Sequence, residues 1–483
     1  MKVLLSLLLD ASLVLATFSL ASAQTWQPLN NQPSFAAGPA LLLTDGSVIV
    51  QQIGGRHWWR LTPDNTGSYQ NGTWTQIASL PPDYSPYAFA SAVMPDGRVI
   101  VEGGEYNFFH ADWTVLGAIY DPLANKWTSV APPGGWNSIG DAESVILPDG
   151  TFMLANCCSF PPAAALFDLQ TFSWSITGKN KQDSYDEEGW TLLPDGTVLT
   201  VDTSNGKHAE KYIPELGKWV SAGNTGVLLA DPSSEEIGPA VLRPDGTVFA
   251  TGANVSGSGH TSVYYPPADR MKPGTWIPGP DIPDGNDMAD TPAALLPSGN
   301  VLCDTNPGVA NPPSTFYEFD GEKFTKVPGP PNAQYEDTEA SSMLVLPTGQ
   351  ILFTDGSSDV ELYTASGKPQ AAWKPKITSV AKNLMRGSSY VISGTQFNGL
   401  SQGAMYGDDQ QMATNYPLVK ITNRGSGHVF YARTHDHSTM AVATGSQIVS
   451  TTFDVPSAME TGASSLAVVA NGISSSTVAV NIE

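Results

Sequence analysis

The sequence has few basic residues, few cysteines and little charge overall. Only 14% of its 483 residues are charged, with 23 lysines and arginines against 46 aspartates and glutamates. The net charge of −23 argues against a nucleic-acid-binding protein, because a phosphate-binding surface needs clustered basic side chains. Three cysteines are too few for a disulfide scaffold in a chain of this length. An acidic, globular protein without such a scaffold is therefore expected.

Long hydrophobic runs are also missing, except at the N-terminus. Residues 3–20 follow Lys2 and are apolar apart from Asp10 and small polar residues, and Ala21-Ser22-Ala23 fits the small-x-small pattern of signal-peptide cleavage. This pattern predicts a signal peptide over residues 1–23 and no integral membrane segment after its removal. The protein is expected to be secreted, or periplasmic in a Gram-negative host.

Two of the three cysteines, Cys157 and Cys158, are adjacent in the sequence. In an oxidising compartment they can form a vicinal disulfide. The alternative is a pair of small buried apolar side chains within a strand. The sequence leaves both interpretations open.

Glycine and proline are abundant, with 46 and 38 residues, and many of them belong to one repeated turn. The turn resembles Leu-Pro-Asp-Gly and each copy precedes a short apolar run. Proline presets φ, aspartate bonds its own backbone and glycine accepts a positive φ, as a tight hairpin requires. Seven copies occur, 46 to 53 residues apart, with their glycines at Gly46, Gly97, Gly150, Gly196, Gly246, Gly299 and Gly349.

Each copy is followed by a β-rich run, an aromatic strand and a strand that usually carries tryptophan. Four short strands in about 50 residues are typical of a kelch-type propeller blade. The sequence therefore predicts an all-β protein with a seven-bladed kelch-type β-propeller over residues 24–373. A circular array needs its two ends joined, and Trp26 is the expected closing strand, with Trp373 as its competitor.

The repeat ends near residue 374. Residues 374–483 alternate apolar and polar side chains between glycine, serine and asparagine turns, as in Ser388–Ile392 and Ser465–Val469. This pattern predicts a C-terminal immunoglobulin-like (early-set) β-sandwich.

A kelch propeller followed by such a domain resembles the galactose oxidase and glyoxal oxidase family. The resemblance covers nearly the whole mature chain, and its local signature is the segment Gly427–Met440, in which Thr434-His435 looks like the family's copper-binding Thr-His pair. The family's other site residues fall just before the repeated turns. There this chain has Asp141 for a copper-ligand tyrosine, Ala88 for the cross-linked cysteine and Glu339-Ala340 for a Tyr-His pair. Radical copper oxidase activity is therefore not expected.

Acidic residues instead precede the turn in five successive blades, where the innermost strand begins beside the channel. Clustered carboxylates repel one another unless a cation neutralises them. The predicted metal ligands are Asp141, Glu339, His435 and His437, because a His-x-His pair is a common ligand spacing. The predicted acid–base or ligand-binding residues are Glu143, Glu188, Glu236 and Asp290. Solvated surface acids and a hydrogen-bonded histidine pair at the domain junction are the alternatives.

These residues predict a secreted protein that binds a ligand or metal at the acidic mouth of the propeller's central channel, where His435 and His437 are also expected. The expected metal is Ca²⁺, Mn²⁺ or Zn²⁺ rather than a copper-radical centre. An extracellular glycan or a small molecule is the expected partner. The alternative is a metal-dependent enzyme, an oxidoreductase or a hydrolase, that uses the carboxylates and His435.

Overall fold

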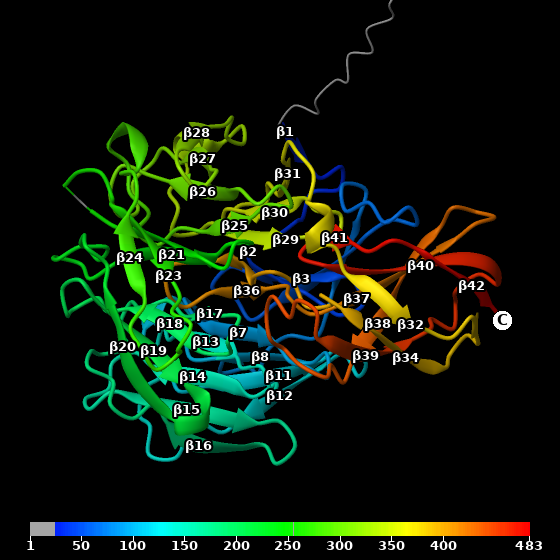
Figure 1. Ribbon diagram of the computed structural model, residues 1–483, viewed down its shortest axis with the longest axis horizontal. Coiled ribbons are helices and arrows are strands. Elements are labelled where there is room, and N and C mark those ends of the chain that lie inside the picture. The colour runs from blue at the N-terminus through cyan, green and yellow to red at the C-terminus, as the bar shows by residue number, and fades with distance from the viewer. Residues whose placement is uncertain (1–24, 255) are drawn as a thin grey trace, which may run out of the picture.

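Four-stranded antiparallel sheets form the larger part of the molecule, and a curled sheet forms its C-terminal part (Figure 1). The computed structural model describes residues 25–254 and 256–483. The signal peptide predicted over residues 1–23 lies outside the described residues. Each four-stranded sheet of the repeat is called a blade below, numbered in chain order.

The blades follow the seven repeated turns in the described part of the chain. The first blade contains β2 (Ala37–Leu42), β3 (Val48–Gln52), β4 (Trp58–Thr62) and β5 (Thr73–Gln76). The second contains β7 (Ala90–Val93), β8 (Val99–Glu102), β11 (Gly117–Asp121) and β12 (Lys126–Val130). The third contains β13 (Ser144–Ile146), β14 (Phe152–Asn156), β15 (Ala163–Asp168) and β16 (Ser173–Thr177). The fourth contains β17 (Thr191–Leu192), β18 (Val198–Val201), β19 (His208–Ile213) and β20 (Lys218–Asn224).

The remaining blades have the same order. The fifth contains β21 (Ile237–Leu242), β22 (Val248–Gly252), β23 (Thr261–Tyr265) and β24 (Thr275–Pro278). The sixth contains β25 (Ala293–Leu295), β26 (Val301–Thr305), β27 (Thr315–Phe319) and β28 (Phe324–Lys326). The seventh contains β29 (Ser342–Val345), β30 (Ile351–Thr354), β31 (Glu361–Thr364) and β1 (Thr25–Pro28). A small sheet outside the blades contains β6 (Pro86–Tyr87), β9 (Tyr106–Asn107) and β10 (His110–Ala111).

The seven repeated turns join the first and second strands of the blades, as the sequence predicts. In the first turn the amide of Gly46 donates to the carbonyl of Leu43 at 3.0 Å, and the amide of Ser47 donates to Asp45 Oδ1 at 3.0 Å. The turn glycines of all seven copies have φ between 76° and 94°. This conformation is energetically unfavourable for a residue with a Cβ atom but not for glycine, which explains why glycine ends every copy of the turn.

The N-terminal strand closes the ring, as expected for Trp26. Strand β1 pairs antiparallel with β31, with Trp26 opposite Tyr363. The indole of Trp26 donates to the carbonyl of Pro328 in the sixth blade at 2.6 Å, just as Trp127 donates to Ala78 of the preceding blade at 2.9 Å. The competitor Trp373 ends a short 3₁₀ helix, Ala371–Trp373, outside the blade sheets.

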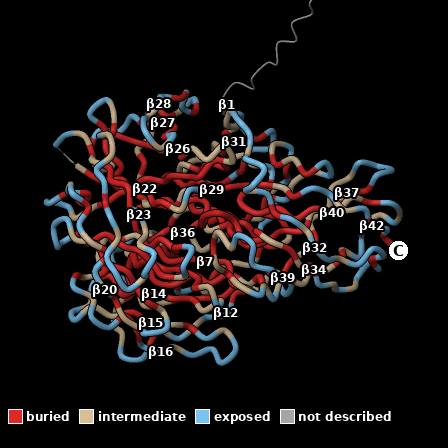
Figure 2. Tube along the Cα trace, viewed as in Figure 1, coloured by how far each residue is buried: buried red, intermediate tan, exposed pale blue. Residues whose placement is uncertain are grey.

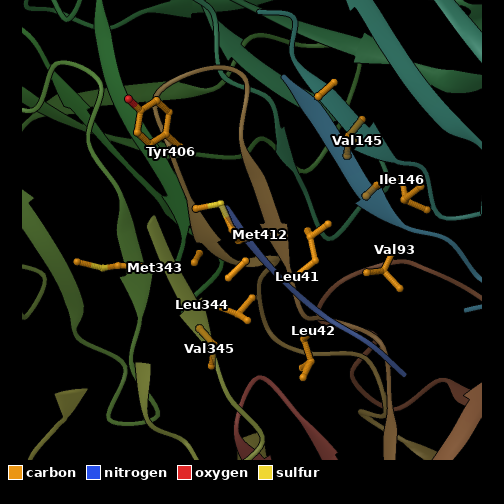
Figure 3. Packing of buried hydrophobic residues seen from close by; sticks show 14 of the residues in the cluster. Leu41, Leu42, Val93, Val145, Ile146, Met343, Leu344, Val345, Tyr406 and Met412 are labelled. Carbon is orange, nitrogen blue, oxygen red and sulfur yellow. The ribbon is translucent and has the colours of Figure 1, made fainter. Parts of the chain in front are cut away.

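A C-terminal segment fills the channel between the innermost strands. Strands β35 (Gly403–Met405) and β36 (Gln411–Ala413) form a hairpin, named the C-terminal hairpin below, and β35 adds to the inner edge of β25. Figure 3 shows Met412 of this hairpin surrounded by inner-strand side chains such as Leu41 and Leu344. The channel is therefore a packed core that ends where the hairpin turns.

The rest of the C-terminal part is a curled sheet with its own core, which includes Ile392, Val419, Phe453 and Leu466. Its strands are β32 (Lys376–Ser379), β33 (Asn383–Leu384), β34 (Ser389–Thr395), β37 (Leu418–Asn423), β38 (Val429–His435), β39 (Ile448–Asp454), β40 (Gly462–Ala470), β41 (Ile473–Ser474) and β42 (Val478–Ile482). Figure 2 shows burial concentrated on the inner strands, with exposed residues along outer strands such as β16. Within the described residues, no helix has the length and apolar character that crossing a membrane would require.

Candidate functional site

A cavity of about 210 Å³ lies where the innermost strands begin and the C-terminal hairpin turns. We call it the mouth pocket. Eight of its lining side chains carry a carboxyl group, and none of the described residues that line it is basic. The lining residues are Tyr87, Ala88, Glu105, Tyr106, Asp141, Glu187, Glu236, Asp290, Val309, Glu339, Tyr406, Asp408, Asp409 and Gln410.

The distance in sequence from the turn glycine decides which acids reach the pocket. Asp141, Glu187 and Asp290 lie nine residues before their turn glycines, and Glu236 and Glu339 lie ten before theirs. Glu187 and Asp290 adopt left-handed backbone, with φ of 57° and 47°. Strain of this kind persists where the surrounding structure fixes it, often at functional sites.

The pocket carboxylates form two groups that share one residue. Asp141, Glu187 and Asp408 each offer an oxygen, and these oxygens lie within 4.8 Å of one another. Glu187, Glu236 and Asp290 form a second group under the same limit. Three oxygen ligands at this separation can contact one hard cation, so Glu187 lies between two candidate cation positions.

Burial raises the pKa of all eight carboxyl groups in the pocket above their ordinary values. For Glu187 the charge of Asp408 raises the pKa further, and for Asp290 the charge of Glu236 does so. The pKa of Glu236 itself rises to about 7. A cation bound among these groups would offset both effects and displace the protons.

The tip of the C-terminal hairpin adds Asp408 and Asp409 to the pocket. Both residues are buried, and neither oxygen of Asp409 has a hydrogen-bond partner among the described residues. One oxygen of Asp141 lacks a partner as well. A cation in the pocket would give such buried oxygens a partner.

Glu143 and Glu188 lie below the pocket rather than in it. They precede their turn glycines by seven and eight residues and are fully buried. Glu188 accepts a bond from Lys181 Nζ at 2.6 Å, and the same ammonium lies 2.8 Å from Glu210 and 3.5 Å from Asp202. Glu188 therefore belongs to an internal ion-pair network, which corrects its expected position at the mouth.

The structure also corrects the position of the two histidines. Thr434 donates its amide to Thr44 at 3.1 Å, and Arg433 donates to the carbonyl of Asp96 at 2.6 Å. These partners belong to the repeated turns, at the end of the inner strands opposite the pocket. The inner strands next to these two turns, β2 with six residues and β7 with four, separate the two ends by about 13–20 Å.

Each histidine has local partners at that junction. His435 contacts Asp436 at 2.8 Å and Asp454 at 3.1 Å. His437 contacts Thr451 at 2.9 Å, and burial lowers its pKa to about 3. The pair therefore does not tip the mouth, and one metal site built from both histidines with Asp141 and Glu339 is excluded by this geometry.

Comparisons with known proteins found matches at low sequence identity. No protein-family model matches the chain. A kelch-like protein of Aspergillus terreus, terF, is 27% identical over 128 residues, which cover 26% of this chain and only a quarter of that relative. A fungal alcohol oxidase of the AA5 family, solved in complex with copper, is 14% identical with a TM-score of 0.56 and covers 95% of this chain and 99% of its own. An extracellular domain of a two-component system from B. thetaiotaomicron is 10% identical with a TM-score of 0.49, covering 96% of this chain and 59% of its own.

The chain has the fold of a kelch-repeat β-propeller. Within this kelch propeller, the positions that resemble the copper-radical site of the galactose oxidase family can be compared directly. Ala88, Asp141 and Glu339 all line the mouth pocket. None of the three side chains supplies a phenol, a thiol or an imidazole.

The tyrosines of the kelch propeller's pocket do not replace the missing ones. Burial raises the pKa of Tyr87, Tyr106 and Tyr406, and nearby carboxylates raise it further. The described residues that line the pocket include no cysteine and no histidine, which a cross-linked tyrosine–cysteine pair and imidazole ligands would require. The residues present do not fit a copper-radical centre.

Four pocket acids were not among the predicted site residues: Glu105, Glu187, Asp408 and Asp409. Glu187 was detectable, because it has the same offset from its turn glycine as Asp141 and Asp290. Asp408 and Asp409 follow a glycine between two short apolar segments, which is a weak hairpin signal. Sequence alone gave no reason to place that hairpin inside the channel.

Proposed function

We propose that the protein binds divalent metal ions through carboxylates at the mouth of its propeller. The observation that carries the proposal is the pair of carboxylate groups that share Glu187 inside one cavity. The unpartnered oxygen of Asp141 supports it, because a cation would satisfy it.

The donor set favours a hard ion. Carboxylate oxygens without imidazole or thiolate suit Ca²⁺ or Mn²⁺, whereas Zn²⁺ prefers nitrogen and sulfur ligands. Because His435 and His437 lie at the opposite end of the inner strands, the earlier reason to expect Zn²⁺ at the mouth no longer applies.

Glu187 would bridge two ions, as carboxylates do in two-metal centres. Asp141 and Asp408 would complete the ligands of one ion, and Glu236 and Asp290 those of the other. Glu105, Glu339 and Asp409 stay outside both groups and are free to contact a ligand above the ions.

The test is metal stoichiometry. Chelator-treated protein is titrated with Mn²⁺ in a calorimeter, and bound metal is counted by elemental analysis after dialysis. We expect two ions per chain, one after Asp290→Asn, and a loss of at least tenfold in affinity for both after Glu187→Gln. Glu322→Gln, an exposed turn residue, and His435→Ala are the controls and keep both ions. The absence of bound metal, or binding unchanged by Glu187→Gln, would refute the proposal.

A metal-dependent enzyme is the second candidate, because Glu339 is held near the proposed ions without belonging to either group. Its Oε1 lies 3.4 Å from the hydroxyl of Tyr87, and Tyr406 donates to its carbonyl at 3.0 Å. In this reading Glu339 is an acid–base group for a hydrolase or an oxidoreductase. Glu339→Gln should then keep the metal and lose turnover on a panel of glycosides and alcohols, whereas a binding protein shows no turnover in either form.

The pocket also offers aromatic faces to a partner such as an extracellular glycan or another small polar molecule. Phe109 is 61% exposed and packs 6.0 Å from the ring of Tyr87. Exposed aromatic rings beside polar groups can stack on sugar rings. A glycan array with metal-loaded protein, repeated with Phe109→Ala, tests this partner class.

The finer architecture and the location are part of the same proposal. Six four-stranded sheets, one of them closed by β1, and the strands β25–β28 of a six-stranded sheet support a seven-bladed propeller over residues 24–373. The curled C-terminal sheet with its own core supports an immunoglobulin-like sandwich. Secretion rests on the leader-like sequence of residues 1–23. N-terminal sequencing of the exported protein should begin at Gln24.

A further inference from the structure

A vicinal disulfide lies beside Asp141, which is one of the residues that line the mouth pocket. Cys157 and Cys158, which follow β14, are joined by a disulfide bond, so the sequence's first alternative for this pair is the correct one. Cys157 is fully buried and Cys158 is exposed. Solvent can therefore reach the bond from one side only.

Two carboxylates lie beside the two sulfurs. Asp141, Asp186, Cys157 and Cys158 each offer one ligand atom, and these four atoms lie within 4.8 Å of one another. Cys158 Sγ is 3.9 Å from Asp186 Oδ1. Asp141 is buried, and one of its oxygens has no hydrogen-bond partner among the described residues. This group of side chains therefore contains an oxygen that a metal ion could bind.

The backbone holds the buried sulfur against this group. Gly140 has φ of +75°, and a Cβ atom at this position would lie 2.3 Å from Cys157 Sγ. Only glycine leaves room for the sulfur here. The amide of Cys157 donates to the carbonyl of Ile139 at 3.1 Å, which ties the cysteine to the segment that carries Asp141.

We propose that reduction of the Cys157–Cys158 disulfide creates a second metal site, in which both thiolates and the carboxylates of Asp141 and Asp186 hold one thiophilic divalent ion. Two sulfur and two oxygen ligands form a four-coordinate set that suits Zn²⁺ or Cd²⁺. The site goes beyond the proposed function and shares only Asp141 with it.

The chemistry balances with a dithiol as the reductant. The S–S bond accepts two electrons and two protons and becomes two thiols, while the dithiol becomes a disulfide. Metal binding then releases the two thiol protons to solvent, because only the thiolate is a ligand. In the oxidised protein the sulfurs are bonded to each other and neither is a thiolate.

The test compares metal binding in the two redox states of the full chain. Protein reduced with a dithiol under anaerobic conditions, and untreated protein, are each desalted without oxygen and titrated with Cd²⁺ while near-ultraviolet absorption is recorded. We expect one equivalent of Cd²⁺ to produce a thiolate-to-metal charge-transfer band in the reduced protein and none in the oxidised protein. Cys158→Ser should abolish the band and Asp186→Asn should weaken binding at least tenfold. Cys303→Ser, which removes the buried free cysteine, is the matched control and should keep the band.

Three results would overturn the inference: no band in reduced protein, a band that survives Cys158→Ser, or loss of the folded circular dichroism spectrum on reduction. The last result would show that the segment around Asp141 and Cys157 does not stay folded without the disulfide. Mn²⁺ titration of the oxidised protein tests the mouth pocket separately, so failure of either proposal is distinguishable from failure of the other.

Discussion

Replacement of Lys181 by methionine should destabilise the propeller in a pH-dependent way. The ammonium of Lys181 belongs to a side chain that is only 1% exposed, and it contacts Glu188 at 2.6 Å and Glu210 at 2.8 Å. Burial opposes its charge, but the neighbouring carboxylates outweigh this effect and raise the pKa of Lys181. Methionine has a similar length and removes only the charge.

The size of the effect follows from the carboxylates left behind. Removing one partner of a buried ion pair costs about 3–5 kcal/mol, because the remaining charge has no compensation. For a unit of the propeller's size this corresponds to a fall in Tm of about 4–7 °C at neutral pH. In the variant, burial raises the carboxyl pKa values, so the carboxyl groups are protonated and harmless at low pH. Stability is lost as the pH rises through the raised values, and the deficit should therefore be smallest near the ordinary carboxyl pKa.

Differential scanning calorimetry at several pH values measures the deficit. Lys326→Met is the matched control, because its ion pair with Asp284 is about 60% exposed on both sides and should change Tm by only about 1 °C. Adding Glu188→Gln to Lys181→Met should recover part of the loss. A Lys181→Met deficit no larger than that of the control, or one that is equal at acidic and neutral pH, would refute this account of the network.

Three further predictions concern the closing strand β1, the mouth pocket and the residues beside the disulfide. Trp26→Ala removes the contacts of the closing strand with Phe316 and Tyr363, and should cost about 3 kcal/mol and speed limited proteolysis near β1. In metal-free protein the pKa of Glu236 is raised from 4.5 to about 7 mainly by burial, so Tm should fall as the pH rises through that range, and Mn²⁺ or Glu236→Gln should reduce the fall. A Tm that does not change with pH in the parent protein would contradict this prediction. Gly140→Ala would press a Cβ atom against Cys157 Sγ and should therefore lower Tm, measured by calorimetry, while leaving the turn hairpins intact.

The repeated turns show why so much of the fold was predictable. Each turn is a local device of four residues, and the positive φ of its glycine is required whatever surrounds it. The seven glycines therefore gave the blade spacing, and the offset of nine or ten residues placed Asp141, Asp290, Glu236 and Glu339 at the mouth. Glu188 and Glu143, at offsets of eight and seven residues, are buried outside the pocket.

The histidines show the limit of local patterns. Thr434-His435 matches a family motif letter by letter, but a dipeptide does not indicate which end of a channel its loop reaches. That depends on how the C-terminal sheet packs against the repeated turns, through contacts such as Arg433 to Asp96 that are more than 300 residues apart in sequence.

The sequence by itself determined the repeated strand-and-turn pattern and the acidic character of the mouth, because these depend on neighbouring residues and on a regular period. The structure decided that Trp26 rather than Trp373 belongs to the closing strand. Only the tertiary structure decided that the hairpin 403–413 enters the channel with Asp408 and Asp409 at its tip, that Glu187 lies between two carboxylate groups, and that Cys157 and Cys158 stand behind Asp141. These are contacts between distant segments, fixed by packing in the channel, and no local pattern specifies them.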